Sequence, residues 1–217
     1  MRIYDLTGTL EAGMWDYGEP FTPFSIKRIS SMEEDGYVAS QVSLTTHTGT
    51  HIDCARHFGE EKTPIDKLDV STFLGGARLL DVSEKCRPGK GIGEQDLIEA
   101  GGEELYQGQI CVLKTGWETM WDQGGYTENY PYLTVEGAEF LATKKIKLFA
   151  ADIPIVGNPH DTDTDMVFCA KGIPSVYGLV NLGQLPETFT FAAFPLKLAE
   201  ADGSPVRAVA WEEGTER

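Results

Sequence analysis

Cysteine is scarce in this chain, and its four copies lack the spacings of a metal or disulfide framework. Cys54, Cys86, Cys111 and Cys169 form no Cys-x-x-Cys pair, which argues against a zinc ribbon or a thioredoxin-type motif. Four cysteines in 217 residues are also too few for a disulfide scaffold. The chain must depend on ordinary packing, and at this length it can bury a sizeable core without covalent links.

Positive charge is also in short supply. Eighteen lysines and arginines face 34 acidic residues, for a formal net charge of −16, and they form no basic stripe. Because phosphate binding requires clustered lysine and arginine, we expect neither nucleic acid nor an anionic membrane as a partner. The chain has no apolar run long enough for a membrane span and no visible secretory signal. We therefore expect a soluble, cytoplasmic protein, and the acidity itself indicates nothing specific about the substrate.

The chain has no linker, repeat or low-complexity tract, so we expect one domain over residues 1–217. Residues 37–45 alternate, with Val38, Val42 and Leu44 on one face, which predicts a half-buried strand. Further strands are expected at 76–82, 109–114, 147–152, 188–194 and 206–211, and helices at 93–100 and 134–145. Strands interspersed with helices predict a mixed α/β or α+β architecture.

Histidine is rare but concentrated, because three of the four histidines lie between His47 and His57. On a helix, Asp53 would point away from the face shared by His47 and His51. On a straight strand those two imidazoles would be roughly 13 Å apart, too far for one ion. A bend is therefore required between them, and Gly49 can supply it. After the bend, His51 and Asp53 share a strand face and can converge with His47.

Two imidazoles and one carboxylate leave a coordination position open, which is typical of a catalytic metal site. The metal would lower the pKa of a coordinated water to roughly 7. His57 follows Asp53 by four residues and is suited to general acid–base work beside that water. The alternative is a turn of hydrogen-bonded polar residues, which such dense clustering disfavours. Cys54 should face away from Asp53, as a buried structural thiol.

The stretch from His47 to Phe58, HTGTHIDCARHF, resembles the His-x-Gly-Thr-His-x-Asp-x-Pro-x-His signature of the metal-dependent cyclase family, which includes bacterial kynurenine formamidase and isatin hydrolase. Segments 5–7, 115–117, 194–197 and 202–209 resemble that family in order. The resemblance implies a swivelling β/β/α fold, a homodimer or homotetramer, and amide or lactam hydrolysis. It also implies one or two zinc or manganese ions per chain. By motif match, the metal ligands would be His47, His51 and Asp53, and the general acid–base residue would be His57.

Several departures from the family pattern bear on the proposed site. Ala55 replaces the proline of the signature, and Arg56 follows it beside the site. Asp165 and Tyr177 stand where formamidases carry a second histidine and a glutamate. Asp165 could still bind an ion, and Tyr177 could hydrogen-bond a substrate oxygen. Alternatively, the second ion is bound by a nearby run of three residues, His160, Asp161 and Asp163. The competing interpretation of this run is a solvated acidic loop.

The preferred function is hydrolysis of a small amide, lactam or ester. Trp15 and Phe21, with Tyr17 and Phe24 nearby, lie in a segment broken by glycine and proline and could line an aromatic substrate pocket. Ordinary loop or core packing is the alternative for each of them. Two other functions compete: a metal-containing binding protein without turnover, and a metal-dependent lyase or cyclase acting on a hydroxy or keto acid.

Overall fold

The computed structural model describes residues 1–212 and is built around a sheet that closes on itself. The strand order is β1-β12-β11-β5-β7-β9-β10-β4, and β12 also pairs with β4. Seven strands therefore form a closed barrel, with β1 (Ile3–Asp5) outside it on β12. The barrel strands are β4 (His51–Asp53), β5 (Leu74–Asp81), β7 (Ile110–Lys114), β9 (Leu148–Ala151), β10 (Ser175–Tyr177), β11 (Thr188–Pro195) and β12 (Gly203–Trp211).

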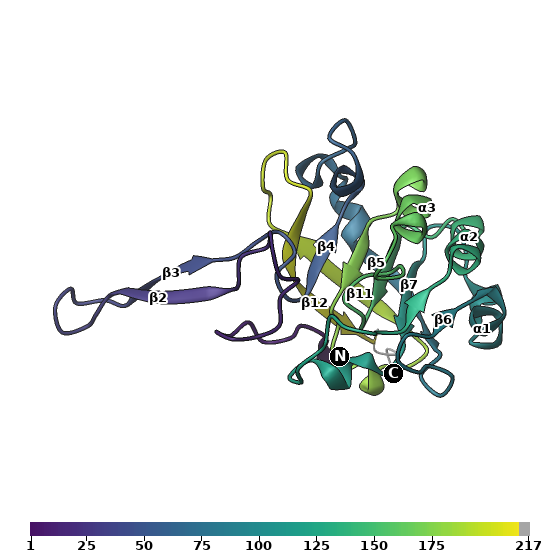
Figure 1. Cartoon of the computed structure of the whole chain (residues 1–217), viewed down its shortest axis with the longest axis horizontal. Coiled ribbons are helices and arrows are strands. Elements are labelled where there is room, and N and C mark those ends of the chain that lie inside the picture. The colour runs from purple at the N-terminus through teal and green to yellow at the C-terminus, as the bar shows by residue number, and fades with distance from the viewer. Residues whose placement is uncertain (213–217) are drawn as a thin grey trace.

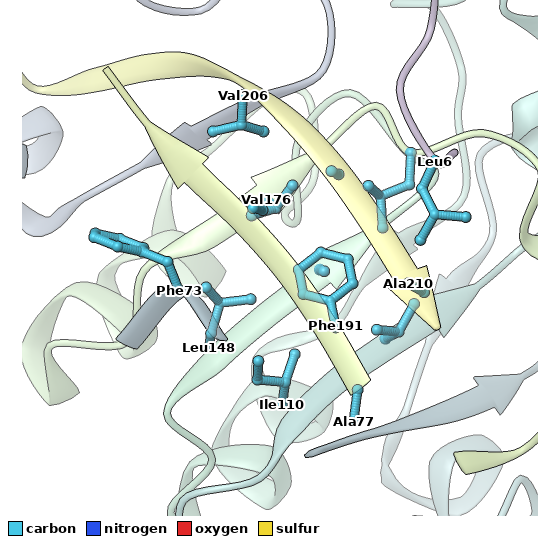
Figure 2. Close-up of a cluster of buried hydrophobic side chains, with 14 of the residues drawn as sticks. Leu6, Phe73, Ala77, Ile110, Leu148, Val176, Phe191, Val206 and Ala210 are labelled. Carbon is cyan, nitrogen blue, oxygen red and sulfur yellow. The ribbon is translucent and has the colours of Figure 1, made fainter. Parts of the chain in front are cut away.

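The central barrel strands are buried on both faces. In β7, Ile110 and Val112 belong to a cluster to which all seven barrel strands contribute, so this cluster fills the barrel interior (Figure 2). Cys111 and Leu113 point the other way, into a second cluster shared with the helices. Strands β5, β7, β9 and β10 pair in parallel. Their near-continuous apolar runs follow from this position, because both faces are covered.

Three helices cover the outside of the parallel strands: α1 (Glu94–Glu99), α2 (Val135–Thr143) and α3 (Asp163–Lys171) (Figure 1). Thr134 caps the start of α2, since its side chain accepts a hydrogen bond from the Gly137 N–H. The remaining elements are short: β6 (Gly91–Ile92), β8 (Tyr132–Leu133) and the 3-10 helices η1 (Ala55–Phe58), η2 (Ile65–Lys67), η3 (Val70–Phe73), η4 (Gly102–Glu104), η5 (Trp117–Met120) and η6 (Leu182–Gln184). Within residues 1–212, no helix combines the length and apolarity needed to cross a membrane.

A two-stranded arm projects from the barrel (Figure 1). It consists of β2 (Ser25–Ser30) and β3 (Ala39–Ser43), which among the described strands pair only with each other. The strand expected over residues 37–45 is present as β3, but the prediction that it is half-buried is wrong. Val38 and Val42 are 52% and 48% exposed, because neither a second layer nor the barrel covers the arm within residues 1–212.

A buried carboxylate ties the end of β9 to the loop after β7. Asp152 is fully buried and accepts hydrogen bonds from the backbone N–H groups of Thr115, Gly116 and Glu118, and from the Thr115 hydroxyl. Asp152→Ala leaves several buried donors unpaired and should lower the free energy of unfolding by about 3–5 kcal/mol. Urea denaturation measures this loss. Asp81→Ala, at an exposed ion pair, should change it by less than about 1 kcal/mol; equal losses would contradict the account.

Candidate active site

A left-handed bend positions the histidine cluster. Gly49 has a φ of 66°, a conformation that glycine adopts without strain. The neighbouring Thr50 hydroxyl donates to the Gly178 carbonyl at 2.6 Å, which anchors the bend to the barrel. Strand β4 begins directly after it and is held between β10 and β12. His51 and Asp53 therefore project from one face of a strand that is paired on both sides, and the bend predicted at Gly49 is confirmed.

Three ligand atoms converge in this cluster. Asp53 Oδ1 lies 2.7 Å from His47 Nδ1 and 3.4 Å from His51 Nε2, and one atom from each residue lies within 4.8 Å of the others. All three residues are buried. The His51 Nδ1 atom faces the Gly49 carbonyl at 2.7 Å, so Nδ1 carries the proton and Nε2 has a free lone pair. This set of nitrogen and oxygen donors fits a divalent transition metal with an open position.

The electrostatics of the three residues suit the same role. Burial lowers the pKa of His51 to about 4, so its imidazole is neutral at pH 7. Burial alone would raise the pKa of Asp53, but the positive charge of His47 and its hydrogen bond lower it, so the carboxylate is ionised. Burial opposes protonation of His47 as well, yet the Asp53 charge and the hydrogen bonds to Asp202 and Asp53 raise its pKa to about 10. A cation bound here would displace that proton.

His57 stands beside the ligands on η1 and is held by a residue that the sequence did not reveal. Asp202 Oδ2 lies 3.1 Å from His57 Nδ1 and 2.8 Å from His47 Nε2. Asp202 is far from the cluster in sequence, and only the pairing of β12 with β4 brings it there. The resemblance over residues 202–209 included this position, but nothing in the sequence gave it a role. The His57 side chain is 30% exposed, so it is accessible from solvent.

A cleft of about 380 Å³ opens over the cluster. Phe21 and Tyr17 line it, whereas Trp15 packs against Trp121 and Tyr126 with ring centroids 5.1 and 4.6 Å away. The remaining lining residues come from the signature segment, the loop between β9 and α3, and the start of α3: His47, His51, Asp53, His57, Phe58, Pro154, Ile155, Asn158, Pro159, His160, Asp161, Thr162 and Asp165. The structure thus places Phe21, but not Trp15, at the expected pocket.

Two neighbours of the signature segment lie outside this cleft. Arg56 is not among its lining residues, and its guanidinium instead donates to the Glu60 carbonyl and lies 3.5 Å from Glu200. Cys54 is 3% exposed, and burial raises the pKa of its thiol to about 11. Cys54 is therefore the inert, buried thiol predicted from the sequence.

Asp165 and Tyr177 lie at the back of the site. Asp165 is 3% exposed, and its Oδ1 atom has no hydrogen-bond partner among residues 1–212. It belongs to neither of the two groups of converging ligand atoms found there, which are His47, His51 and Asp53, and His47, His57 and Asp202. Tyr177 is buried with its ring centroid 5.6 Å from that of His51. It faces a water-sized void shared with Asp53 and Asp165 and does not line the cleft. A role for Asp165 as a metal ligand, or for Tyr177 in substrate binding, stays a prediction.

The alternative ligands at residues 160–163 divide between two surfaces. His160 and Asp161 line the cleft. Asp163 lies instead in a groove between α2 and α3. The proposed shifted site would therefore have at most two of its three members at the cleft.

Asp165 should make the stability of the metal-free protein depend on pH. Burial, with the Asp53 charge adding to it, raises the pKa of Asp165 to about 7. The folded state then keeps a proton that the unfolded chain releases above pH ~4, so stability falls as pH rises from ~4 to ~7. With a chelator present, Asp165→Asn should gain about 2 kcal/mol relative to wild type between pH 5 and pH 8 in urea denaturation. A difference that is flat with pH would contradict this.

Comparison with known proteins agrees with this geometry. A model of the putative cyclase family matches residues 4–157. A kynurenine formamidase of Bacillus thuringiensis (strain Al Hakam) is 34% identical over 191 residues, which is 87% of each chain. One from Geobacillus thermodenitrificans (strain NG80-2) is 32% identical over 192 residues, covering 86% of this chain and 87% of the relative.

Solved structures show the same fold. Isatin hydrolase A from Labrenzia aggregata, bound to benzyl benzoate, superposes with a TM-score of 0.88 at 22% identity, covering 98% of this chain and 94% of that one. An isatin hydrolase bound to the product analogue thioisatinate gives 0.85 at 23% identity, covering 96% and 91%. The expected single-domain α/β fold is therefore confirmed. The family model and the formamidase relatives, together with the convergence of the signature histidines and aspartate, show that this chain belongs to the putative cyclase family.

Proposed function

We propose that this protein is a metal-dependent hydrolase of a small amide, lactam or ester, with a single zinc or manganese ion held by His47, His51 and Asp53. The observation that carries the proposal is the convergence of these three side chains at the floor of a cleft that His57 also lines. The formamidase and isatin hydrolase relatives support it, because the names of both describe cleavage of a C–N bond.

When bound, such an ion supplies Lewis-acid activation of a water and of the substrate carbonyl. The protein's own part is proton transfer. His57 Nδ1 faces the Asp202 carboxylate, so Nε2 is the nitrogen left to take a proton from the attacking water. The imidazolium then returns that proton to the leaving nitrogen or oxygen, which lets the tetrahedral intermediate collapse to products.

The cleft wall favours an uncharged, partly aromatic substrate. Tyr17, Phe21 and Phe58 line it, and Phe21 stacks edge-on against His47 with ring centroids 5.7 Å apart. Among the described residues, the lining contains no lysine or arginine that could pair with a substrate carboxylate. A compact aryl amide or lactam can contact these rings without burying an unpaired charge.

A substrate panel tests this function. Protein purified without chelator and loaded with zinc or manganese is offered an N-formyl arylamine, isatin and an aryl ester. Hydrolysis of at least one, abolished by chelator and restored by metal, is the expected result. Tight binding without consumption of any compound would favour a binding protein. Loss of water from a hydroxy acid without cleavage of an amide would favour a lyase.

We also propose that the protein is a homodimer or homotetramer, assembled through the β2–β3 arm. An isolated two-stranded hairpin is at best marginally stable in water, and the arm is covered by nothing else in the described chain. Its exposed apolar side chains supply a surface for a second copy to cover: Ile26, Ile29, Met32, Tyr37, Val38 and Val42.

A charge placed on the arm should break this assembly. Ile26 and Val42 are cross-strand partners on one face of the arm, so Ile26→Asp should convert the oligomer to a monomer in analytical ultracentrifugation. Gln41→Asp, on the opposite face and already polar, is the matched control and should leave the mass unchanged. A wild-type protein that sediments as a monomer would contradict the proposed assembly.

We propose the cytoplasm as its location. None of the four cysteines forms a disulfide in the structure, and three of them are buried. None belongs to the proposed metal site. This usage is typical of proteins kept in a reducing compartment. Cell fractionation tests it, and recovery of the protein outside the cytoplasm would contradict it.

A further inference from the structure

One carboxylate oxygen joins the two functional halves of the site. Asp202 Oδ2 is 2.8 Å from His47 Nε2 and 3.1 Å from His57 Nδ1. An ionised carboxylate can only accept hydrogen bonds, so each ring nitrogen that faces it carries a hydrogen. The opposite nitrogens are then available for function: Nδ1 of His47 can bind a cation once the cation displaces the proton shared with Asp53, and Nε2 of His57 can act as the base.

The fold fixes the backbone of Asp202 against the strand that carries the ligands. The Asp202 carbonyl accepts the Cys54 N–H at 3.0 Å, and the next residue, Gly203, pairs with Asp53 across β12 and β4. A Cβ atom at Gly203 would lie 2.6 Å from the Ile52 carbonyl oxygen and 3.2 Å from His47 Cε1. The glycine therefore permits a close approach of β12 that no other residue would allow, and this approach places the carboxylate.

We propose that Asp202 is a positioning residue that sets the tautomers of His47 and His57 together, coupling the metal ligand to the acid–base group. The coupling to catalysis rests on the proposed function, but the effect on the two rings does not. A carboxylate behind a ligand histidine orients the ring and raises its basicity. Here the same carboxylate also orients the catalytic ring, so a single substitution should disturb both metal binding and proton transfer.

Two consequences can be measured without any substrate. Asp202→Asn keeps the size of the side chain but removes its negative charge. The two imidazole rings then no longer share a charged hydrogen-bond acceptor. Its metal affinity, measured by competition with a chromogenic chelator, should fall about 10- to 100-fold. His57 should also lose its preference for the Nδ1–H tautomer, which long-range ¹H–¹⁵N NMR reports directly. With only four histidines in the chain, these signals can be assigned by single substitutions.

The kinetic consequence is non-additivity. At saturating metal, Asp202→Asn should lower kcat about 10- to 100-fold with little change in KM. In a His57→Ala background the same change should lower kcat no further, because the residue acts through His57. Asp202→Glu, which keeps the charge, should recover part of both the metal affinity and kcat. A merely structural role would predict multiplying losses and no recovery.

Glu200→Gln is the matched control. Glu200 is a nearby acidic residue with a 60% exposed side chain that pairs with Arg56, and its loss should leave metal affinity, tautomer and kcat unchanged. The inference would be overturned if, in Asp202→Asn, the metal affinity and the fraction of His57 in the Nδ1–H tautomer were both within twofold of wild type. If Asp202→Asn does not fold, as judged by circular dichroism, Asp202→Glu is read in its place by the same two measurements. If no substrate is ever turned over, the proposed function fails while these two readouts still decide the role of Asp202.

Discussion

Asp53→Asn should abolish turnover, with a loss of at least about 10³-fold in kcat/KM. Asp53 Oδ1 lies 2.7 Å from His47 Nδ1 and 3.4 Å from His51 Nε2, and asparagine removes the only anionic donor of the three. The Lewis acidity of a bound metal contributes several kcal/mol to transition-state stabilisation, and ~4 kcal/mol corresponds to about 10³ in rate. The change is isosteric, so the fold should persist in circular dichroism.

Metal content separates this effect from a defect in folding. Elemental analysis of Asp53→Asn should find less than about a tenth of an ion per chain at metal concentrations that saturate wild type. Asp81→Asn makes the same chemical change at a surface ion pair with Lys114 and should keep both metal and activity. A variant at position 53 that kept its metal and more than a tenth of wild-type turnover would contradict the ligand assignment.

His57→Ala should lower kcat by about 10²- to 10⁴-fold, the range typical of a lost general acid–base group. It should retain its metal, because the proposed ligand group of His47, His51 and Asp53 does not include His57; loss of the metal would instead point to the second group of converging ligand atoms, His47, His57 and Asp202. The pattern is therefore opposite to that of Asp53→Asn, where metal and activity disappear together.

Added imidazole provides the control for His57→Ala. The His57 side chain is 30% exposed and lines the cleft, so a free imidazole can reach the space that alanine leaves. Partial recovery of kcat, increasing with imidazole concentration, is the expected result, and a His57→Phe variant, which fills that space, should not recover. Unchanged turnover in His57→Ala for every hydrolysed substrate would remove the acid–base role.

The site was predictable where its geometry is local. His47, His51 and Asp53 lie within seven residues, so the distance between strand neighbours and the permissiveness of Gly49 sufficed to predict a bend and a convergence. The contact of Asp202 could not be predicted in this way. It depends on a pairing of β12 with β4 across about 150 residues, and the sequence carries no local signal for such a contact.

The fold shows the same division. Buried parallel strands such as β7 and β9 were located because their apolar runs and bounding turns are visible along the chain. Helix α3 was not predicted, since its acidic first turn and its weak apolar periodicity read as a loop. Strand β3 was located but assigned the wrong burial, because alternation of side chains does not say whether another layer covers them.

The arm illustrates why that difference matters for function. A half-buried strand next to the histidine cluster would belong to the hydrophobic core and pack against the site. The exposed hairpin instead presents Ile26 and Val42 outward, so the segment leading into the cluster belongs to the proposed contact with a second copy. Assembly and catalysis would then share one continuous stretch of chain.

The most direct test of the account is anomalous diffraction at the absorption edge of the bound metal, from crystals grown with zinc or manganese. The account predicts one strong peak within about 2.0–2.3 Å of a His47 nitrogen, His51 Nε2 and an Asp53 oxygen. A peak elsewhere in the chain, or these three side chains turned away from any common point in metal-soaked crystals, would contradict it.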